Sequence, residues 1–207
     1  MPGEHVVVIG AGVGGLVSAA LLAARGHDVT VLEAAATSGG KLRALDGIDG
    51  GPTVFTLRHL FDEIFAECGG SLDAELVVRP AQTIARHAWG PDPFRARLDL
   101  HADPQASEDA IGRFAGASQA RGYRAFRAEA QRIYDALDAP FLRRSNTNPL
   151  GLGWRMGLAG LRDYATLHPY TSLWRALGQY FADPRLRQLF GRYATYCGSS
   201  PFRAPAT

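Results

Sequence analysis

The chain has 207 residues, 46% of them hydrophobic and 20% charged, and a formal net charge of +2, a composition that excludes a disordered or fibrous protein. Its two cysteines form neither a disulfide framework nor a paired metal-ligand spacing, so a reducing compartment is expected. Residues 1–112 carry 8 Lys/Arg and 15 Asp/Glu, whereas residues 113–207 carry 14 and 5. The arginines of this basic half are spread among aromatic residues and leucines, which argues against a nucleic-acid partner.

The first predicted element is a strand at Val6–Ile9, whose β-branched run is typical of a strand covered on both faces in a parallel sheet. Gly10, Gly12 and Gly15 then complete a G-x-G-x-x-G pattern, and Gly14 lies in the same turn. Such a turn, followed by a helix N-terminus, offers free N–H groups to a diphosphate. Residues 6–24 carry no charge, but these glycines argue against a membrane span or an export signal.

A helix is predicted to run from this turn to about Arg25, where Gly26 provides the C-terminal cap. A second strand follows at Val29–Leu32 and ends in Glu33. An acid at this distance from the glycine turn hydrogen-bonds the ribose hydroxyls of an adenine nucleotide. Because Glu33 would repel a 2′-phosphate, a free 2′-hydroxyl is expected.

The segment after Glu33 continues Ala-Ala-Ala-Thr-Ser-Gly39-Gly40-Lys41-Leu-Arg43. It resembles the extended signature of the flavoprotein superfamily that includes amine oxidases and carotenoid desaturases. That resemblance implies FAD, with the Gly-Gly turn close to the diphosphate and a cation beside it. The alternative is a plain turn with an exposed Lys41.

Asp46-Gly47 is a hairpin signal, and Asp49-Gly50-Gly51-Pro52-Thr53 follows it. From the residues alone, the two glycines leave room for a flat ligand, and Pro52 fixes the bend. The Asp-x-Gly-Pro-Thr run is similar to that of bacterial phytoene desaturases. The longer stretch GPTVFTLRHLFDEIF most resembles the hydroxycarotenoid branch of this carotenoid desaturase family, the 1-hydroxycarotenoid 3,4-desaturases or hydroxyneurosporene desaturases.

Downstream of this run, hydrophobic spacing predicts an amphipathic helix whose apolar stripe is assigned to the core. The stripe consists of Leu57, Leu60, Phe61, Ile64, Phe65 and Cys68. Residues 83–89 and 97–101 are predicted to pair as strands, with His87 and Trp89 on one face. Whether that face meets core or substrate is left open.

The remainder is predicted to be helical, with starts at Asp103-Pro104 and Asp183-Pro184. The fold class is therefore α/β: a Rossmann-like FAD-binding part at 1–102 and a mainly helical substrate-side part at 103–207. Between the helices, Leu150–Leu158 alternates with glycines and arginines. Two readings remain open for it, contact with an anionic membrane surface or a buried helix contact.

The resemblance implies an FAD-dependent desaturase that dehydrogenates an acyclic 1-hydroxycarotenoid at carbons 3 and 4. The six histidines are scattered, and no metal cluster or catalytic set is assigned. Alternatives are a phytoene desaturase, an amine-oxidase-like flavoenzyme, or a non-catalytic nucleotide-binding remnant. Because family members are more than twice as long, the chain is expected to be a truncated N-terminal portion that holds FAD poorly. A cytoplasmic location, peripheral on the inner membrane, is expected.

The resemblance also implies which residues contact the cofactor. They are Gly10, Gly12, Gly14, Gly15, Glu33, Gly39, Gly40, Lys41, Arg43, Gly51, Pro52 and Thr53.

Overall fold

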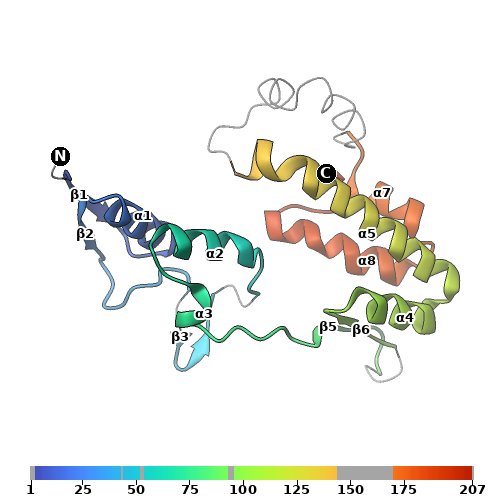
Figure 1. Ribbon diagram of the computed structural model, residues 1–207. Helices are drawn as coiled ribbons and strands as arrows, with labels where there is room; N and C mark the ends of the chain where they lie inside the picture. The colour runs from blue at the N-terminus through green and yellow to red at the C-terminus, as the bar shows by residue number, and fades with distance from the viewer. Residues whose placement is uncertain (1–2, 43, 52–53, 93–95, 144–169, 207) are drawn as a thin grey trace. The chain divides into compact units, whose positions relative to one another are not determined.

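The computed structural model describes residues 3–42, 44–51, 54–92, 96–143 and 170–206 (Figure 1). The chain divides into two compact units, Met1–Arg79 and Pro80–Thr207. Each unit is described by itself below.

The first unit begins with a strand–helix–strand motif. Strand β1 (His5–Ile9) pairs in parallel with β2 (Asp28–Leu32), and helix α1 (Val13–Ala24) connects them. Gly26, directly after the helix, has a φ of 89°, a conformation that glycine adopts without steric cost. The strand, helix and cap predicted from the sequence are confirmed.

One prediction about β1 is wrong. The strand is covered on only one face, because α1 packs over Val6 and Val8, which are partly buried. On the other face Val7 is 47% exposed and Ile9 is 87% exposed. Within the part of the chain that the structure describes, β1 and β2 form a sheet of two strands, so no further layer covers this face.

A short hairpin and two helices complete the first unit. Strands β3 (Ala44–Leu45) and β4 (Ile48–Asp49) flank Asp46 and Gly47, whose positive φ values of 52° and 78° confirm the predicted turn. Helix α2 (Arg58–Glu67) is followed by α3 (Leu72–Glu75).

The expected helix at α2 is confirmed, but its assignment to the core is wrong. No residue of α2 is buried, because little of the first unit packs against it. The Arg25 guanidinium, at the C-terminal cap of α1, donates to Glu67 of α2 at 2.6 Å, and both side chains are exposed.

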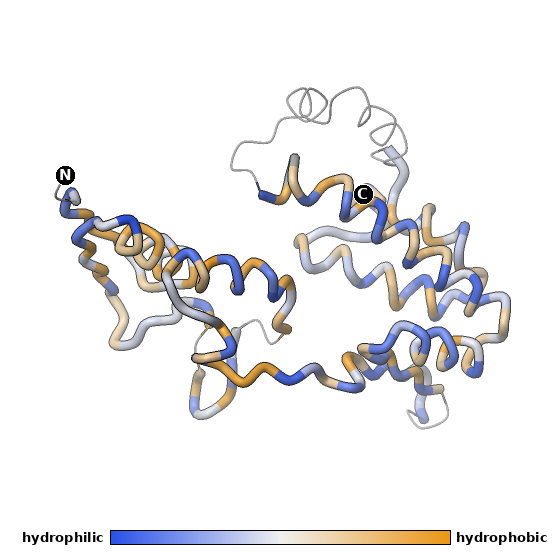
Figure 2. Tube along the Cα trace, viewed as in Figure 1, coloured by the Kyte–Doolittle hydropathy of each residue, from blue (hydrophilic) through white to orange (hydrophobic). Residues whose placement is uncertain are grey.

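The second unit begins with the predicted antiparallel hairpin, β5 (Thr83–Ala88) and β6 (Arg97–His101). Its α-helices are α4 (Pro104–Ala115), α5 (Ala117–Leu137), α7 (Leu173–Tyr180) and α8 (Pro184–Gly191), with a short π-helix η1 (Asp138–Leu142) and a 3₁₀ helix η2 (Arg192–Cys197). Figure 2 shows hydrophobic and hydrophilic residues alternating along α5, as expected for an amphipathic helix.

Both predicted helix starts are confirmed by their caps. Asp103 accepts hydrogen bonds from the N–H groups of Gln105 and Ala106 at the start of α4. Asp183 accepts from the N–H of Arg185 at the start of α8. In each case a proline occupies the first turn of the helix. An N–H group at this position would have no intrahelical acceptor, so its absence in proline costs no hydrogen bond.

The core of the second unit joins the hairpin to α4, α5, α7 and α8. Its buried members are Leu98, Leu100, Ala110, Ile111, Tyr123, Leu177, Phe181, Leu186, Leu189 and Phe190. The ring of Phe190 on α8 lies 5.1 Å from that of Phe126 on α5, so these two helices lie side by side (Figure 1). By contrast, the buried apolar residues of the first unit are Ala11, Ala19 and Leu72, among those described.

This core also accounts for the position of the unit boundary. The sequence predicted that the nucleotide-binding part ends at residue 102, whereas along the chain the first compact unit ends at Arg79 and the second begins at Pro80. Hairpin β5–β6 belongs with the helices because Leu98 and Leu100 are buried against α4 and α8. Among the described residues, no helix is long and apolar enough to cross a bilayer.

Candidate dinucleotide-binding site

The glycine turn lies between β1 and α1 and is held by backbone hydrogen bonds. The N–H of Gly10 donates to the carbonyl of Leu32 at 2.7 Å, and the first bond of α1 runs from Leu16 N–H to Gly12 carbonyl. The preceding N–H groups of the helix are therefore left without intrahelical acceptors. They lie at the positive end of the helix dipole, which suits an anionic ligand.

The glycines of this turn have two different roles. A Cβ built on Gly10, Gly12 or Gly14 would meet nothing within 4 Å, so these positions border open space. A Cβ on Gly15 would instead clash with the carbonyl oxygen of Gly10 and lie 3.5 Å from Val8 Cγ1. Gly15 is therefore needed for the close packing of α1 against β1.

Glu33 lies at the end of β2, beside the glycine turn. Its carboxylate accepts from the N–H of Ala11 at 2.7 Å and from the N–H of Ala35 at 2.8 Å. The hydrogen bond from Ala35, and then that from Ala11, hold the pKa of Glu33 below its ordinary 4.5. The carboxylate is thus anionic and fixed in orientation, and its remaining lone pairs can accept from ribose hydroxyls.

The Gly39-Gly40 turn packs directly on the glycine turn. Gly39 N–H donates to Ala11 carbonyl at 2.8 Å, and Gly39 forms a parallel bridge with Gly12. A Cβ on Gly40 would lie 3.1 Å from Gly12 Cα. The two turns therefore form one continuous backbone cradle, a contact that the spacing of the glycines alone did not predict.

A pocket of about 770 Å³ opens beside this cradle. Its lining residues are Gly12, Val13, Gly14, Gly39, Gly40, Lys41, Leu42, Val54, Phe55, Thr56 and Phe61. The rings of Phe55 and Phe61 lie 4.8 Å apart on its apolar side. The pocket lining thus combines glycine backbone, a lysine cation and aromatic rings.

Five of the predicted cofactor residues line the pocket, namely Gly12, Gly14, Gly39, Gly40 and Lys41. Gly10, Gly15 and Glu33 are not among the lining residues, but Gly15 packs against the Gly10 carbonyl and Glu33 accepts from the N–H of Ala11. Gly51 does not line the pocket. Its backbone packs against that of Lys41 and Leu42, since a Cβ on Gly51 would lie 2.9 Å from Leu42 Cα. Arg43, Pro52 and Thr53 lie outside the described residues.

Sequence reasoning missed the aromatic side of the pocket. Phe61 belongs to the helical stripe assigned to the core, and Phe55 precedes α2. No sequence signal for this placement was present: Leu57, immediately before the helix, has a positive φ of 54°. This left-handed residue starts α2 directly after the pocket residues 54–56, but such a conformation is not encoded by hydrophobic spacing.

The strand–helix–strand motif and the glycine cradle are typical of a dinucleotide-binding domain, and comparison with known protein families agrees. Residues 8–63 match the family model for the NAD(P)-binding Rossmann-like domain. The first unit is therefore a Rossmann-like dinucleotide-binding domain.

The relatives narrow this class. The chain is 48% identical over 99% of its length to hydroxyneurosporene desaturase of Rubrivivax gelatinosus, and 45% identical over 97% to that of Cereibacter sphaeroides. It is 38% identical over 99% of its length to phytoene dehydrogenase of Streptomyces griseus. The resemblance to carotenoid desaturases that the sequence predicted is confirmed.

These alignments cover only part of each relative. The chain spans 39%, 40% and 40% of these three proteins, about two-fifths of their length. The shared portion contains both units, because the alignments extend across nearly the whole chain.

Proposed function

We propose that the chain is part of an FAD-dependent carotenoid desaturase that removes hydrogen from carbons 3 and 4 of an acyclic 1-hydroxycarotenoid. The observation that carries this proposal is the higher identity to hydroxyneurosporene desaturases, 48%, 45% and 41%, than to phytoene dehydrogenase, at 38%. The alignments extend over both units of the chain.

The residues of the pocket fit FAD. Glu33 disfavours the 2′-phosphate of NADP by charge repulsion, and the joined glycine turns provide N–H groups and space for a diphosphate. Lys41 adds a cation at the pocket wall, and Phe55 and Phe61 add flat apolar surface. When bound, the flavin would supply the two-electron oxidation of an unactivated carbon–carbon bond.

The chain's own residues would bind and orient the cofactor in this proposal. The α1 N-terminus and Lys41 compensate the charge of the diphosphate, and Glu33 fixes the ribose. The apolar side of the pocket excludes water from the groups bound there. No side chain is assigned a proton-transfer role.

Peripheral contact with an anionic membrane, on the cytoplasmic side of the inner membrane, is part of the proposal. Tyr193 is 43% exposed, Tyr196 is 65% exposed and Phe202 is 62% exposed, and Arg192 and Arg203 beside them are exposed too. Amphipathic aromatic rings with arginines suit a lipid headgroup region. The Leu150–Leu158 segment, considered for the same contact, lies outside the described residues. Flotation with anionic vesicles should carry the protein, and recovery of none would contradict the contact.

The cofactor is tested by the flavin retained after gel filtration of protein loaded with FAD. Gly12→Ala should lower the affinity for FAD by roughly tenfold, because the new methyl projects into open space where the diphosphate would lie. Ser18→Ala, an exposed change on α1, is the control and should retain wild-type affinity. Tight binding of NAD with none of FAD would overturn the choice of cofactor.

The reaction is tested in cells that accumulate an acyclic 1-hydroxycarotenoid. Loss of two hydrogens adds one conjugated double bond, so the product should absorb at longer wavelength. Conversion of phytoene in preference to the hydroxylated substrate would favour a phytoene desaturase instead.

A further inference from the structure

A pocket in the second unit shares no residue with the dinucleotide site and is lined by arginines from three elements. It has a volume of about 460 Å³. The arginines are Arg97 of β6, Arg113 of α4 and Arg185 of α8. Two further lining residues, Leu98 and Ala110, are buried members of the core, so the pocket lies against the core of the unit.

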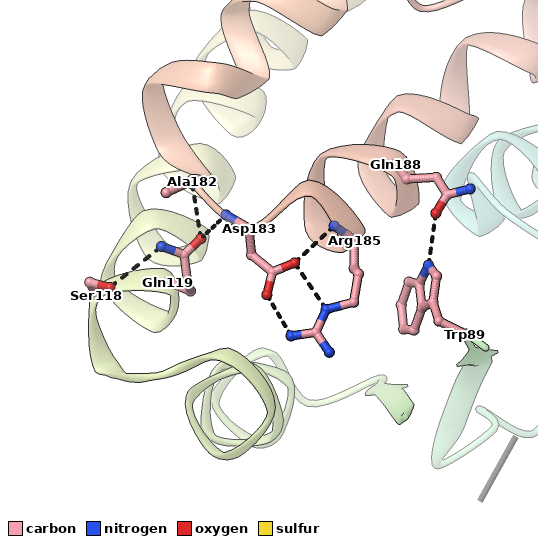
Figure 3. Close-up of polar contacts among 7 residues, drawn as sticks. All are labelled: Trp89, Ser118, Gln119, Ala182, Asp183, Arg185 and Gln188. Carbon is pink, nitrogen blue, oxygen red and sulfur yellow. Dashed lines mark hydrogen bonds and ion pairs between the residues drawn. The ribbon is translucent and has the colours of Figure 1, made fainter. Parts of the chain in front are cut away.

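Arg185 is held in a fixed orientation by its neighbours. Its Nε and Nη2 atoms donate to the two carboxylate oxygens of Asp183 at 3.1 and 2.6 Å (Figure 3). Its guanidinium also lies over the ring of Phe114, with Cζ 4.1 Å from the ring centroid. Asp183 engages only part of the guanidinium, and its other N–H donors have no acceptor within the described part of the chain. Because the orientation is already set, a ligand would not have to order this side chain.

Arg97 and Arg113 carry positive charge that the described residues leave largely uncompensated. Asp99, which also lines the pocket, accepts from Arg86 at 2.8 and 2.9 Å through both carboxylate oxygens, whereas it lies 3.8 Å from Arg97. Arg113 has no carboxylate within 4.0 Å among the residues described, and Asp109, one turn earlier on α4, accepts a hydrogen bond within its own helix instead. The other arginines at the site each have a carboxylate of their own, so two positive charges remain. Their mutual repulsion would be relieved by a bound anion.

The charge and the arrangement of donors suit a phosphate group. Guanidinium groups are weakly hydrated and bind phosphate through paired N–H donors. A carboxylate presents two oxygens in one plane, which a single guanidinium already engages, as Arg185 does with Asp183. A phosphate presents its oxygens in tetrahedral directions, so it can accept from arginines on three separate elements. At about 30 Å³ for each water-sized group, the pocket holds on the order of fifteen non-hydrogen atoms, enough for a phosphate and a small group esterified to it.

We propose that the pocket of Arg97, Arg113 and Arg185 binds the phosphate group of a phosphate ester. A phosphate monoester carries a charge of about −1.5 to −2 at neutral pH, which balances the two surplus positive charges. Two sources offer this chemistry, a soluble phosphate ester and the headgroup of an anionic phospholipid, and vesicle binding separates them. The pocket lies outside the dinucleotide cradle, so the proposal does not depend on the carotenoid reaction.

Binding is measured on the whole chain by NMR, with the side-chain Nε–H signals of the three arginines as reporters. The probes are glycerol 3-phosphate and malonate, which has the same charge at about pH 8 but carries it on two carboxylates. Glycerol 3-phosphate should shift these signals and bind roughly 5- to 10-fold more tightly than malonate, a range between an exposed ion pair and a hydrogen bond to a charged group. Absence of a shift, or equal or tighter binding of malonate, overturns the proposal. Lys41→Gln should leave the titration unchanged, which separates this pocket from the dinucleotide cradle.

Substitution of one arginine tests whether the pocket itself is responsible. Arg113→Gln should weaken the binding of glycerol 3-phosphate by roughly 5- to 10-fold, measured from the Arg97 and Arg185 signals. Arg113→Lys, which keeps the charge but loses the planar fork of donors, should recover part of the affinity. Arg127→Gln removes the same charge from an exposed position of α5 outside the pocket and is the matched control. Equal weakening in Arg113→Gln and Arg127→Gln would show that net charge alone acts, and it overturns the proposal.

Flotation then identifies the source of the phosphate. Vesicles of phosphatidylcholine and phosphatidylglycerol in equal parts are compared with phosphatidylcholine vesicles that oleic acid gives the same negative charge. Flotation that Arg113→Gln reduces only on the phosphatidylglycerol vesicles assigns the pocket to a phospholipid headgroup. Equal flotation of the wild-type protein and the variant on both vesicles, with glycerol 3-phosphate bound as expected, assigns it to a soluble ester. Flotation that the variant reduces equally on both vesicles reflects surface charge without recognition of phosphate, and it overturns the proposal.

Discussion

Replacing Gly15 by alanine should destabilise the first unit, whereas the same change at Gly14 should not. A Cβ at position 15 would lie 3.1 Å from the Gly10 carbonyl carbon. It would lie closer still to the carbonyl oxygen, at less than the 3.0 Å that a Cβ contact can tolerate without a shift of the structure. Both groups belong to the backbone, so neither can rotate away. Helix α1 would have to move from β1, and overpacking of this kind costs roughly 1–3 kcal/mol, with a backbone clash at the upper end.

Gly14 provides a matched comparison on the same helix. Its Cβ would meet nothing within 4 Å. Alanine is favoured over glycine in a helix by about 0.8–1.0 kcal/mol, so Gly14→Ala should keep or raise the stability of the first unit. Because Gly14 lines the pocket, the added methyl should still weaken nucleotide binding.

The assay follows from the distribution of tryptophans. All three, at positions 89, 154 and 174, belong to the second unit, so their fluorescence does not report on α1. Hydrogen exchange of peptides covering residues 5–25 does. Faster exchange there in Gly15→Ala, with an unchanged fluorescence transition in urea, is expected. Equal protection in Gly14→Ala and Gly15→Ala would refute the reasoning.

Two further substitutions probe single polar groups. Glu33→Gln should weaken the protection of β2 amides from hydrogen exchange at pH 7. Since the pKa of Glu33 is depressed in the folded chain, the stability that its carboxylate contributes is lost as the pH falls below about 4.5. The exchange rates of the wild-type protein and the variant should therefore converge at low pH. A constant difference across pH would contradict this. Gln119→Leu should lower the urea midpoint of unfolding measured by tryptophan fluorescence. The buried side chain of Gln119 accepts from the N–H groups of Ala182 and Asp183 at 3.1 and 3.2 Å (Figure 3). Leucine would leave both N–H groups unpaired, at a cost of roughly 1–3 kcal/mol each. Gln105→Leu, exposed on α4, is its control, and equal midpoints in the two variants would count against the role of Gln119.

The sequence predicted the elements whose causes are local. The Asp103 and Asp183 caps, the Asp46-Gly47 turn and the spacing from the glycine turn to Glu33 each depend on a few neighbouring residues. For this reason the βαβ unit, the hairpin and the helix starts were predictable.

What could not be predicted depends on contacts between distant segments. The packing of Gly40 on Gly12 and the place of Phe61 at the pocket need the path of the chain between them. The face shared by His87 and Trp89, left open by the sequence, packs against α4 and α8 and encloses a pocket. Hydrophobic spacing indicates that a face is apolar but not what covers it.

The unequal cores of the two units have a calorimetric consequence. Unfolding of the second unit exposes large apolar side chains such as Phe181 and Phe190 to water, and such exposure raises the heat capacity. The described part of the first unit buries only Ala11, Ala19 and Leu72 among its apolar residues, so its melting should carry little heat-capacity change. A ligand that binds only the folded first unit should raise its thermal midpoint, since a ligand at 100 times its dissociation constant adds about 2.7 kcal/mol.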